Sequence, residues 1–193
     1  MKSIAVYCGA SHGVSPVYAA AARELAQVMV ARGLRLVYGG GNVGLMGVIA
    51  DEVLRLGGTA IGVIPQALMA REVGHTGLTE LHVVRDMHER KALMADLADG
   101  FIAMPGGFGT LEELFEMLTW SQLGIHRKPV GLLNTDGFWD GLLRFVDHLH
   151  EQGFVRPPQV ASVLHAAHAD PLVTRLAAEA ALTAGLPEHP ELR

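Results

Sequence analysis

The chain has a single cysteine, few charged residues and no long apolar run. With Cys8 alone, neither a disulfide framework nor a thiolate metal cluster can form. Charged residues make up 18% of the sequence and the formal net charge is −5, which argues against a general nucleic-acid binder. No apolar stretch approaches the roughly 20 residues that a membrane span needs, and the run at residues 4–8 is too short for a signal peptide. We therefore expect a cytoplasmic protein that binds neither nucleic acid nor membrane.

Several motifs of nucleotide-binding and hydrolytic enzymes are also missing. No GxGxxG sequence opens the first predicted helix, which disfavours a nicotinamide or flavin enzyme. The GxxxxGK(S/T) loop of P-loop ATPases and the GxSxG elbow of serine hydrolases are absent as well. The ten histidines are scattered along the chain, and those at positions 148, 150, 165 and 168 are interpreted as surface residues. The sequence therefore predicts no metal site.

What remains is an alternation of short apolar strands with helices, in a chain that is 50% hydrophobic. Strands are predicted at residues 4–8, 34–38, 60–64, 81–84, 100–104 and 130–133, with a weaker one at 163–168. Helices are predicted at residues 16–32, 43–56, 87–98, 111–123 and 138–152, and Asp170 is expected to cap a last helix that reaches residue 182. This pattern indicates an α/β domain, residues 1–185, with about six or seven parallel strands and helices on both faces. Residues 186–193 are expected to form a flexible tail.

Three glycine-rich segments follow predicted strands, at residues 8–13, 39–47 and 105–110. Ligands of parallel sheets bind beyond the carboxyl ends of the strands, so three such segments at one edge point to a binding site. In the second segment, Gly40 and Gly41 could let the backbone approach a ligand closely. Alternatively, these glycines serve only a tight turn and close packing of helix on sheet.

The third segment carries the most information about chemistry. Its N–H groups would lie at the positive end of the helix at residues 111–123, where a phosphate can bind. Glu113 stands one turn into that helix, which suggests chemistry on a phosphorylated substrate. Alternatively, Thr110 and Glu113 have the spacing of a capping box and serve only the helix end. Three glycines among residues 106–109 exceed what a cap needs, and this favours the phosphate site.

The same helix has two faces that are at least partly apolar. The face predicted to pack on the sheet consists of Leu111, Leu114, Phe115 and Leu118. The second face consists of Glu113, Met117 and Trp120. It could line a base-binding pocket or a subunit interface, or it could be an ordinary half-exposed surface.

A further candidate is Arg90. Asp86 and Glu89 have capping-box spacing, so a helix should begin near Met87 and place Arg90 in its apolar stripe. A buried guanidinium needs an anionic partner. That partner could be a structural carboxylate or a ligand, and both alternatives stay open on these residues.

Four segments together resemble one family. PGGFGTLEE (residues 105–113) matches the signature PGGxGTxxE, and MHERK (87–91), GGGNVGLMG (39–47) and QLGIHRKP (122–129) occur in the family's order. The chain thus resembles the LOG ("lonely guy") family, the cytokinin riboside 5′-monophosphate phosphoribohydrolases, over residues 4–150. The resemblance implies a Rossmann-like, doubly wound fold in a homodimer that needs neither metal nor cofactor.

The resemblance also implies a reaction and a set of site residues. Family members cleave the N-glycosidic bond of a purine nucleoside 5′-monophosphate and release the base and ribose 5-phosphate. Arg90 and Glu113 would be catalytic. Substrate contacts would come from Glu72, Lys91, Gly107, Phe108, Gly109, Thr110 and Thr119.

Two other functions remain to be weighed. A non-catalytic carrier of a nucleotide or nucleotide cofactor could keep the glycine turns, but it would not need Arg90 and Glu113 together. Relatives have also been labelled lysine decarboxylases. A pyridoxal-phosphate enzyme needs a Schiff-base lysine, and the chain offers only Lys2, Lys91 and Lys128.

Overall fold

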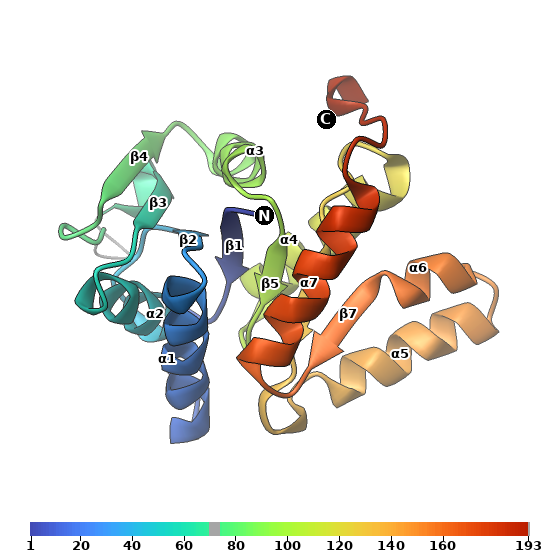
Figure 1. Cartoon of the computed structure of the whole chain (residues 1–193), viewed down its shortest axis with the longest axis horizontal. Helices are drawn as coiled ribbons and strands as arrows, with labels where there is room; N and C mark the ends of the chain where they lie inside the picture. Colours follow the sequence, from blue (N-terminus) through green and yellow to red (C-terminus); the bar gives the residue numbers. More distant parts are fainter. Residues whose placement is uncertain (70–73, 193) are drawn as a thin grey trace.

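The structure is a computed structural model that describes residues 1–69 and 74–192 (Figure 1). One sheet of seven parallel strands has the order β4-β3-β2-β1-β5-β6-β7. The strands are β1 (Ser3–Tyr7), β2 (Arg35–Tyr38), β3 (Ala60–Pro65), β4 (Glu80–Val84), β5 (Phe101–Ala103), β6 (Val130–Leu133) and β7 (Val163–Ala166). The helices are α1 (Pro16–Ala31), α2 (Gly44–Arg55), α3 (Met87–Leu97), α4 (Phe108–Leu123), α5 (Asp140–Glu151), α6 (Pro157–Ala161) and α7 (Ala169–Thr183). The predicted fold class and the seventh strand are confirmed.

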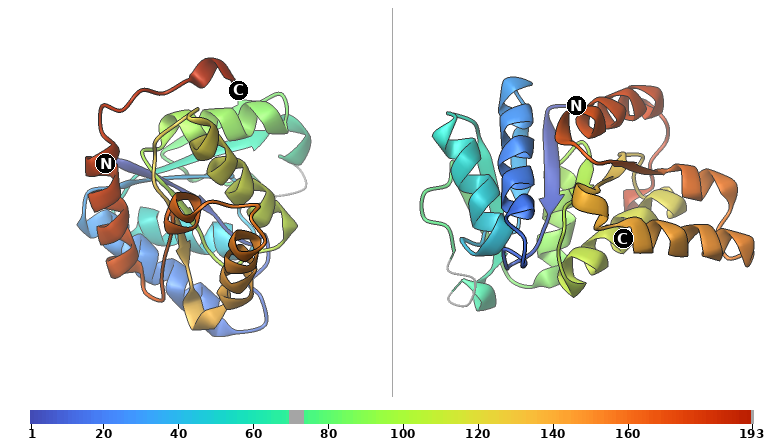
Figure 2. Two further views of the ribbon diagram at one scale, coloured as in Figure 1. Left: turned by 90° about the vertical axis from the view of Figure 1, so that its right-hand side faces the viewer. Right: turned by 90° about the horizontal axis from the view of Figure 1, so that it is seen from below.

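The central strands of the sheet are buried on both faces because they are apolar at nearly every position, whereas the outer strands β4 and β7 are partly exposed. Side chains alternate along β1, so that Ile4 and Val6 pack on one face while Ala5 and Tyr7 pack on the other. Helices α1, α2 and α7 cover the first face. Helices α3 and α4 cover the second, and α5 extends with α6 at the end of the sheet that carries β7 (Figures 1 and 2).

The chain reverses its direction of travel across the sheet at β1. Strands β1 to β4 are added outward on one side, and the chain then returns to place β5 on the other side of β1. The loops that follow β1 and β5 therefore meet, and the Gly9 N–H donates to the Pro105 carbonyl oxygen at 3.1 Å. Ligands of doubly wound folds bind at this kind of switch point.

The predicted start of α4 is wrong, and its predicted buried face is right in part. The helix begins at Phe108, with Gly107 at its N-cap, so Thr110 lies inside the helix and is not its cap. The buried residues of α4 are Thr110, Glu113, Leu114 and Met117, whereas Phe115 is 39% exposed. Leu111, Leu114 and Leu118 of the predicted face do pack against the core of the sheet, so this prediction fails only at Phe115.

Of the two other predicted helix caps, one is confirmed and one is wrong. Asp86 caps α3 as expected, since its Oδ1 accepts from the Glu89 N–H at 2.9 Å. Asp170 does not cap α7, which begins at Ala169 after His168. The short helix α6 was not predicted, because its five residues are too few for a periodic pattern.

Residues 186–192 run back along the body of the protein. The His189 N–H donates to the Gly124 carbonyl oxygen at 2.8 Å, and the Glu188 carboxylate accepts from the Arg127 N–H at 3.0 Å. The flexibility of this tail stays a prediction. Within the described ranges, no helix is both long and apolar enough to cross a membrane.

Gly44 joins α2 to the loop after β1, and we predict that this position accepts no side chain. Its φ is +57°, and an added β-carbon would lie 2.3 Å from Ala10 C and Ser11 N. Gly44→Ala should lower the free energy of unfolding by about 2–5 kcal/mol, because left-handed strain and overpacking add. Urea denaturation measures this loss.

Gly57 provides the matched control. Its φ is +76°, and an added β-carbon would meet nothing within 4 Å. Gly57→Ala should therefore cost only the strain, about 1–2 kcal/mol. Equal losses for the two variants would show that the contact between α2 and the first loop does not constrain the chain.

Candidate active site

A cavity of about 280 Å³ lies at the carboxyl edge of the sheet, at the switch point. The end of β1 and its loop (residues 6–10), Gly39, Met46 and Leu68 form part of its lining. Helix α3 adds Met87 and Arg90. The start of α4 adds Gly107, Gly109, Thr110, Glu112 and Glu113. The two predicted catalytic residues therefore line one cavity.

The N-terminus of α4 forms one wall of this cavity. The first hydrogen bond of the helix runs from the Leu111 N–H to the Gly107 carbonyl oxygen at 3.1 Å, so the N–H groups of residues 108–110 have no partner within the helix. Thr110 is buried between this turn and Gly106, where an added β-carbon would lie 2.1 Å from the Thr110 Oγ1. The turn can therefore bind a phosphate with backbone donors at the positive end of the helix dipole.

Arg90 brings a positive charge into the cavity wall. Its Nη2 donates to the Gly39 carbonyl oxygen at 3.3 Å, and its Nη1 lies 3.6 Å from the Met87 Sδ. The Nε is buried without a hydrogen-bond partner, and no carboxylate lies within 4.0 Å of the guanidinium in residues 1–69 and 74–192. In the described chain, Arg90 thus lacks the structural ion pair that was one alternative. A buried guanidinium without a carboxylate is placed to receive an anionic ligand.

The Arg90 guanidinium leaves no room for a side chain at Gly39. An added β-carbon at Gly39 would lie 1.9 Å from the Arg90 Nη2, so any larger residue would displace the guanidinium. The sequence pointed to Gly40 and Gly41 of the same turn, but the structure places neither in the cavity wall. Gly40 packs on Ile64 of β3, and Gly41 pairs with Gly74 in a short bridge.

Glu113 supplies a negative charge one turn beyond the start of α4, and its side chain is largely buried. Burial raises the pKa of the Tyr7 hydroxyl and of the Cys8 thiol, and the nearby Glu113 carboxylate raises both further, while Arg90 acts in the opposite direction. Cys8 therefore stays a neutral thiol and is not a nucleophile. The negative charge of Glu113 thus acts on Tyr7 and Cys8, which also line the cavity.

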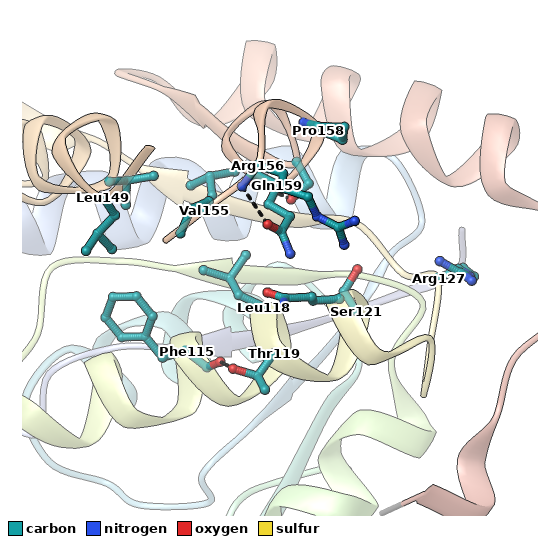
Figure 3. Close-up of a pocket in the computed structure, with 14 residues that line it drawn as sticks. Phe115, Leu118, Thr119, Ser121, Arg127, Leu149, Val155, Arg156, Pro158 and Gln159 are labelled. Atoms are coloured by element: carbon teal, nitrogen blue, oxygen red, sulfur yellow. Dashed lines mark hydrogen bonds between the residues drawn. The ribbon is translucent and has the colours of Figure 1, made fainter. Parts of the chain in front are cut away.

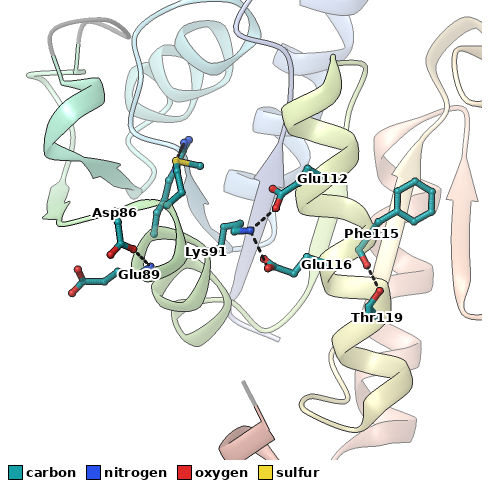
Figure 4. A network of polar contacts seen from close by, with 9 residues as sticks. Asp86, Glu89, Lys91, Glu112, Phe115, Glu116 and Thr119 are labelled. Atoms are coloured by element: carbon teal, nitrogen blue, oxygen red, sulfur yellow. Dashed lines mark hydrogen bonds and ion pairs between the residues drawn. The ribbon is translucent and has the colours of Figure 1, made fainter.

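Among the described residues, the others predicted to contact the substrate do not line this cavity. Phe108 is 92% exposed beside the cavity. The Lys91 Nζ bonds to carboxylates of α4 and is not part of the cavity lining (Figure 4). The Thr119 Oγ1 donates to the Phe115 carbonyl oxygen at 2.7 Å, and both residues line a separate groove toward α5 and α6 (Figure 3). Glu72 lies outside the described residues.

Sequence reasoning missed the apolar wall of the cavity. Met46, Leu68 and Met87 line the side away from α4, and methionines adapt well to a flat ring. Met46 belongs to the glycine-rich segment 39–47, which was recognised only for its backbone. No pattern identified Leu68, because it lies on a short 3₁₀ helix, Gln66–Leu68, in a segment without regular periodicity.

The cavity does not suit a Schiff-base cofactor, because none of the three lysines lines it. Within the described part of the chain, no three histidine, cysteine, aspartate or glutamate side chains are grouped to hold a metal ion. The chemistry at hand is therefore that of a carboxylate, a guanidinium and the backbone donors of a helix end.

Comparison with known proteins identifies relatives. A family model described as "possible lysine decarboxylase" matches residues 46–176. The cytokinin riboside 5′-monophosphate phosphoribohydrolase LOG7 of Arabidopsis thaliana is 51% identical over 91% of this chain and 81% of its own length. The corresponding LOG of Oryza sativa subsp. japonica is 51% identical over 91% of this chain and 72% of its own.

Solved structures share the fold at lower identity. The Moco carrier protein of Chlamydomonas reinhardtii aligns with a TM-score of 0.70 and 22% identity over 94% of this chain and 98% of its own. At that identity the likeness shows the fold alone. The relatives at about half identity, together with the family model, decide membership: the chain belongs to the LOG family of cytokinin riboside 5′-monophosphate phosphoribohydrolases.

Proposed function

We propose that this protein is a cytoplasmic hydrolase that cleaves the N-glycosidic bond of N6-substituted adenosine 5′-monophosphates, releasing the free base and ribose 5-phosphate. The observation that carries the proposal is the cavity in which buried Arg90, without a carboxylate within reach in the described chain, and Glu113 flank the N-terminus of α4. Relatives named for this activity share about half of the sequence.

The phosphate would bind at the first turn of α4, to the backbone of Gly107, Phe108 and Gly109 and to Thr110. This position places the ribose over Glu113. The bond from C1′ to the base breaks with its electron pair leaving on the base, and positive charge develops on the ribose ring. The Glu113 carboxylate stabilises that charge and orients the water that attacks C1′, while a proton from the water passes to the base.

Arg90 acts on negative charge in the same reaction. Its guanidinium either holds the nucleotide phosphate or receives the charge that develops on the departing base. The apolar wall of Met46, Leu68 and Met87 would hold the purine and its N6 substituent. Glu72, Gly40, Gly41 and Thr119 remain predicted contacts that rest on the sequence and the family resemblance.

A nucleotide carrier is the competing function. Proteins of that kind share this fold. A carrier needs the phosphate turn, but a carboxylate inside the cavity would repel an anionic cargo unless it served chemistry. The buried Glu113 therefore favours the hydrolase.

We also propose a homodimer formed through α4, α5 and α6. A groove of about 390 Å³ runs between α4 and the α5–α6 segment, lined by Phe115, Leu118, Leu149 and Val155 among others (Figure 3). Val146 is the one buried residue of α5, whereas Phe145 is 52% exposed and Phe154, beyond the helix, is 81% exposed. An apolar surface of this kind on a protein with few charges is typical of a protein interface.

Glu113→Gln tests the proposed hydrolase. We expect wild-type protein with a metal chelator to release free base from AMP and from N6-prenylated AMP, with faster release from the prenylated nucleotide. The variant should lose on the order of 10²–10⁴ in kcat while keeping its melting temperature, since the amide cannot stabilise the developing charge. Product chromatography and thermal denaturation measure both effects.

Glu179→Gln on α7 is the control, because it removes a carboxylate on the opposite face of the sheet. Its turnover should match the wild type. If the wild type binds both nucleotides but releases no base, the carrier replaces the hydrolase.

Arg90→Met separates binding from stability. Methionine fills a similar volume without a charge that needs a partner, so the melting temperature should stay the same or rise. The Kd for AMP, measured by titration calorimetry, should rise by about 10²-fold or more as the charged hydrogen bonds are lost. Arg85→Met is the control, since Arg85 is exposed and pairs only with Glu89 in the described structure. Unchanged AMP binding with a large loss of stability would assign Arg90 a structural role.

Leu149→Glu tests the proposed dimer. A carboxylate placed in the groove would have to be buried on association, which should weaken the dimer by about 10²-fold or more. Light scattering should then report the 20.6 kDa monomer, whereas the wild type should scatter as twice that mass. Leu182→Glu is the control: the Leu182 side chain is exposed near the end of α7, away from the groove, so this variant should leave the dimer intact. A wild type that scatters as a monomer contradicts the proposal.

A further inference from the structure

Lys91 lies next to Arg90 on α3 but makes different contacts. Its side chain is only 7% exposed, and its Nζ donates to the carboxylates of Glu112 and of Glu116, the latter at 2.9 Å (Figure 4). Glu112 lines the cavity, and Lys91 does not. The family resemblance implies a substrate contact for Lys91, yet in this structure Lys91 is paired with a residue of the cavity lining and is not part of that lining itself.

The first turns of α4 carry more negative charge than phosphate binding favours. Glu112, Glu113 and Glu116 lie within five residues of one another, beside the turn that would hold the 5′-phosphate. Burial alone would lower the pKa of Lys91, but its hydrogen bonds to Glu112 and Glu116 outweigh burial and raise the pKa above the usual value. Lys91 thus stays charged and offsets one of the carboxylates.

We propose that Lys91 is a positioning residue that acts through Glu112: it neutralises the Glu112 carboxylate at the cavity wall, so that the wall accepts an anionic phosphate, and it does not bind the nucleotide itself. This inference rests on the proposed function. Without the lysine, Glu112 would present an uncompensated charge beside the phosphate. The Glu112 side chain is 53% exposed, so water screens part of this repulsion, but like charges a few ångströms apart still repel.

The proposed role predicts that the loss of Lys91 changes KM and leaves kcat nearly unchanged. Glu113 and Arg90 would keep their places, so kcat should change little when Lys91 is lost, whereas KM for the nucleotide should rise. Removing the Glu112 charge as well should bring KM back. A lysine that binds the phosphate directly gives a different result, because neutralising Glu112 does not restore a lost ligand contact.

Two variants that differ only at Glu112 test this prediction. The first combines Lys91→Met with Glu116→Gln, so that no buried charge is left on Glu116 while Glu112 stays ionised. Its KM should rise by about tenfold or more, with kcat within about threefold of the wild type. The second adds Glu112→Gln, and its KM should return to within about threefold of the wild type.

Lys128→Met is the matched control for losing a lysine that contacts α3. The Lys128 Nζ donates to the Ala95 carbonyl oxygen at 2.7 Å, near the end of α3 that is remote from the cavity. This variant should keep the KM and kcat of the wild type. Melting temperatures of all variants show which of them fold.

The KM and kcat values of these variants distinguish the proposed role of Lys91 from the alternatives. A high KM in both Lys91 variants would identify a direct ligand and overturn the proposal, and so would an unchanged KM in both. A fall in kcat at unchanged KM would assign Lys91 to the chemistry and overturn it too. If the first variant does not fold, Lys91→Met with Glu116 unchanged replaces it in the comparison with the second variant, and the same outcomes apply.

The Kd for ribose 5-phosphate, measured by titration calorimetry on the same variants, should follow the same order as KM. This readout does not need turnover, so a wild type that binds ribose 5-phosphate but cleaves no nucleotide would refute the proposed hydrolase and still test Lys91. A wild type that binds neither ribose 5-phosphate nor AMP would overturn both.

Discussion

The hydrogen bond between the Gly9 N–H and the Pro105 carbonyl oxygen joins the two loops on which the site depends. It exists because β5 is added beside β1 after the chain has built β2 to β4 on the other side. Parallel strands place both loops at the same edge, and the glycines let their backbones touch. The phosphate turn at the start of α4 is then anchored to the centre of the sheet, the most rigid part of the fold.

Two charged side chains, Arg90 and Glu113, are buried near the first turn of α4, an arrangement that stability alone would not favour. Arg90 is buried without a carboxylate partner in the described chain, and Glu113 is buried beside hydroxyl and thiol groups whose ionisation it suppresses. Burying a charge costs free energy unless a partner compensates it, and Arg90 has no carboxylate within 4.0 Å in residues 1–69 and 74–192. In the proposed function, the nucleotide phosphate would supply that negative charge. Part of the free energy cost of burying Arg90 would then be offset when the ligand binds.

The strands and all helices except α6 were predictable, because apolar periodicity and glycine positions are local signals. That Arg90 and Glu113 belong to one site was implied by the family resemblance. The start of α4 was not predictable, since Thr110 and Glu113 imitate a capping box while Gly107 caps the helix without a side chain. The predicted buried face of α4 fails only at Phe115, which is 39% exposed. Glu113 and Met117 of the second predicted face are also buried, because α4 contacts both the sheet and the cavity. The contacts of Lys91 depend on how α3 meets α4, and no pattern within either helix encodes that distance.

Helix α4 has to satisfy two demands that conflict. Its N-terminus offers backbone donors that suit a phosphate, while its second and third turns carry Glu113, the carboxylate of the proposed reaction, together with Glu112 and Glu116. Glu112 lines the cavity and Glu116 does not, and Lys91 of the neighbouring helix pairs with both. With the role proposed for Lys91, these ion pairs would let the Glu113 carboxylate and a phosphate site share one helix end. This arrangement explains why α3 supplies two adjacent cations, one facing the ligand space and one facing α4.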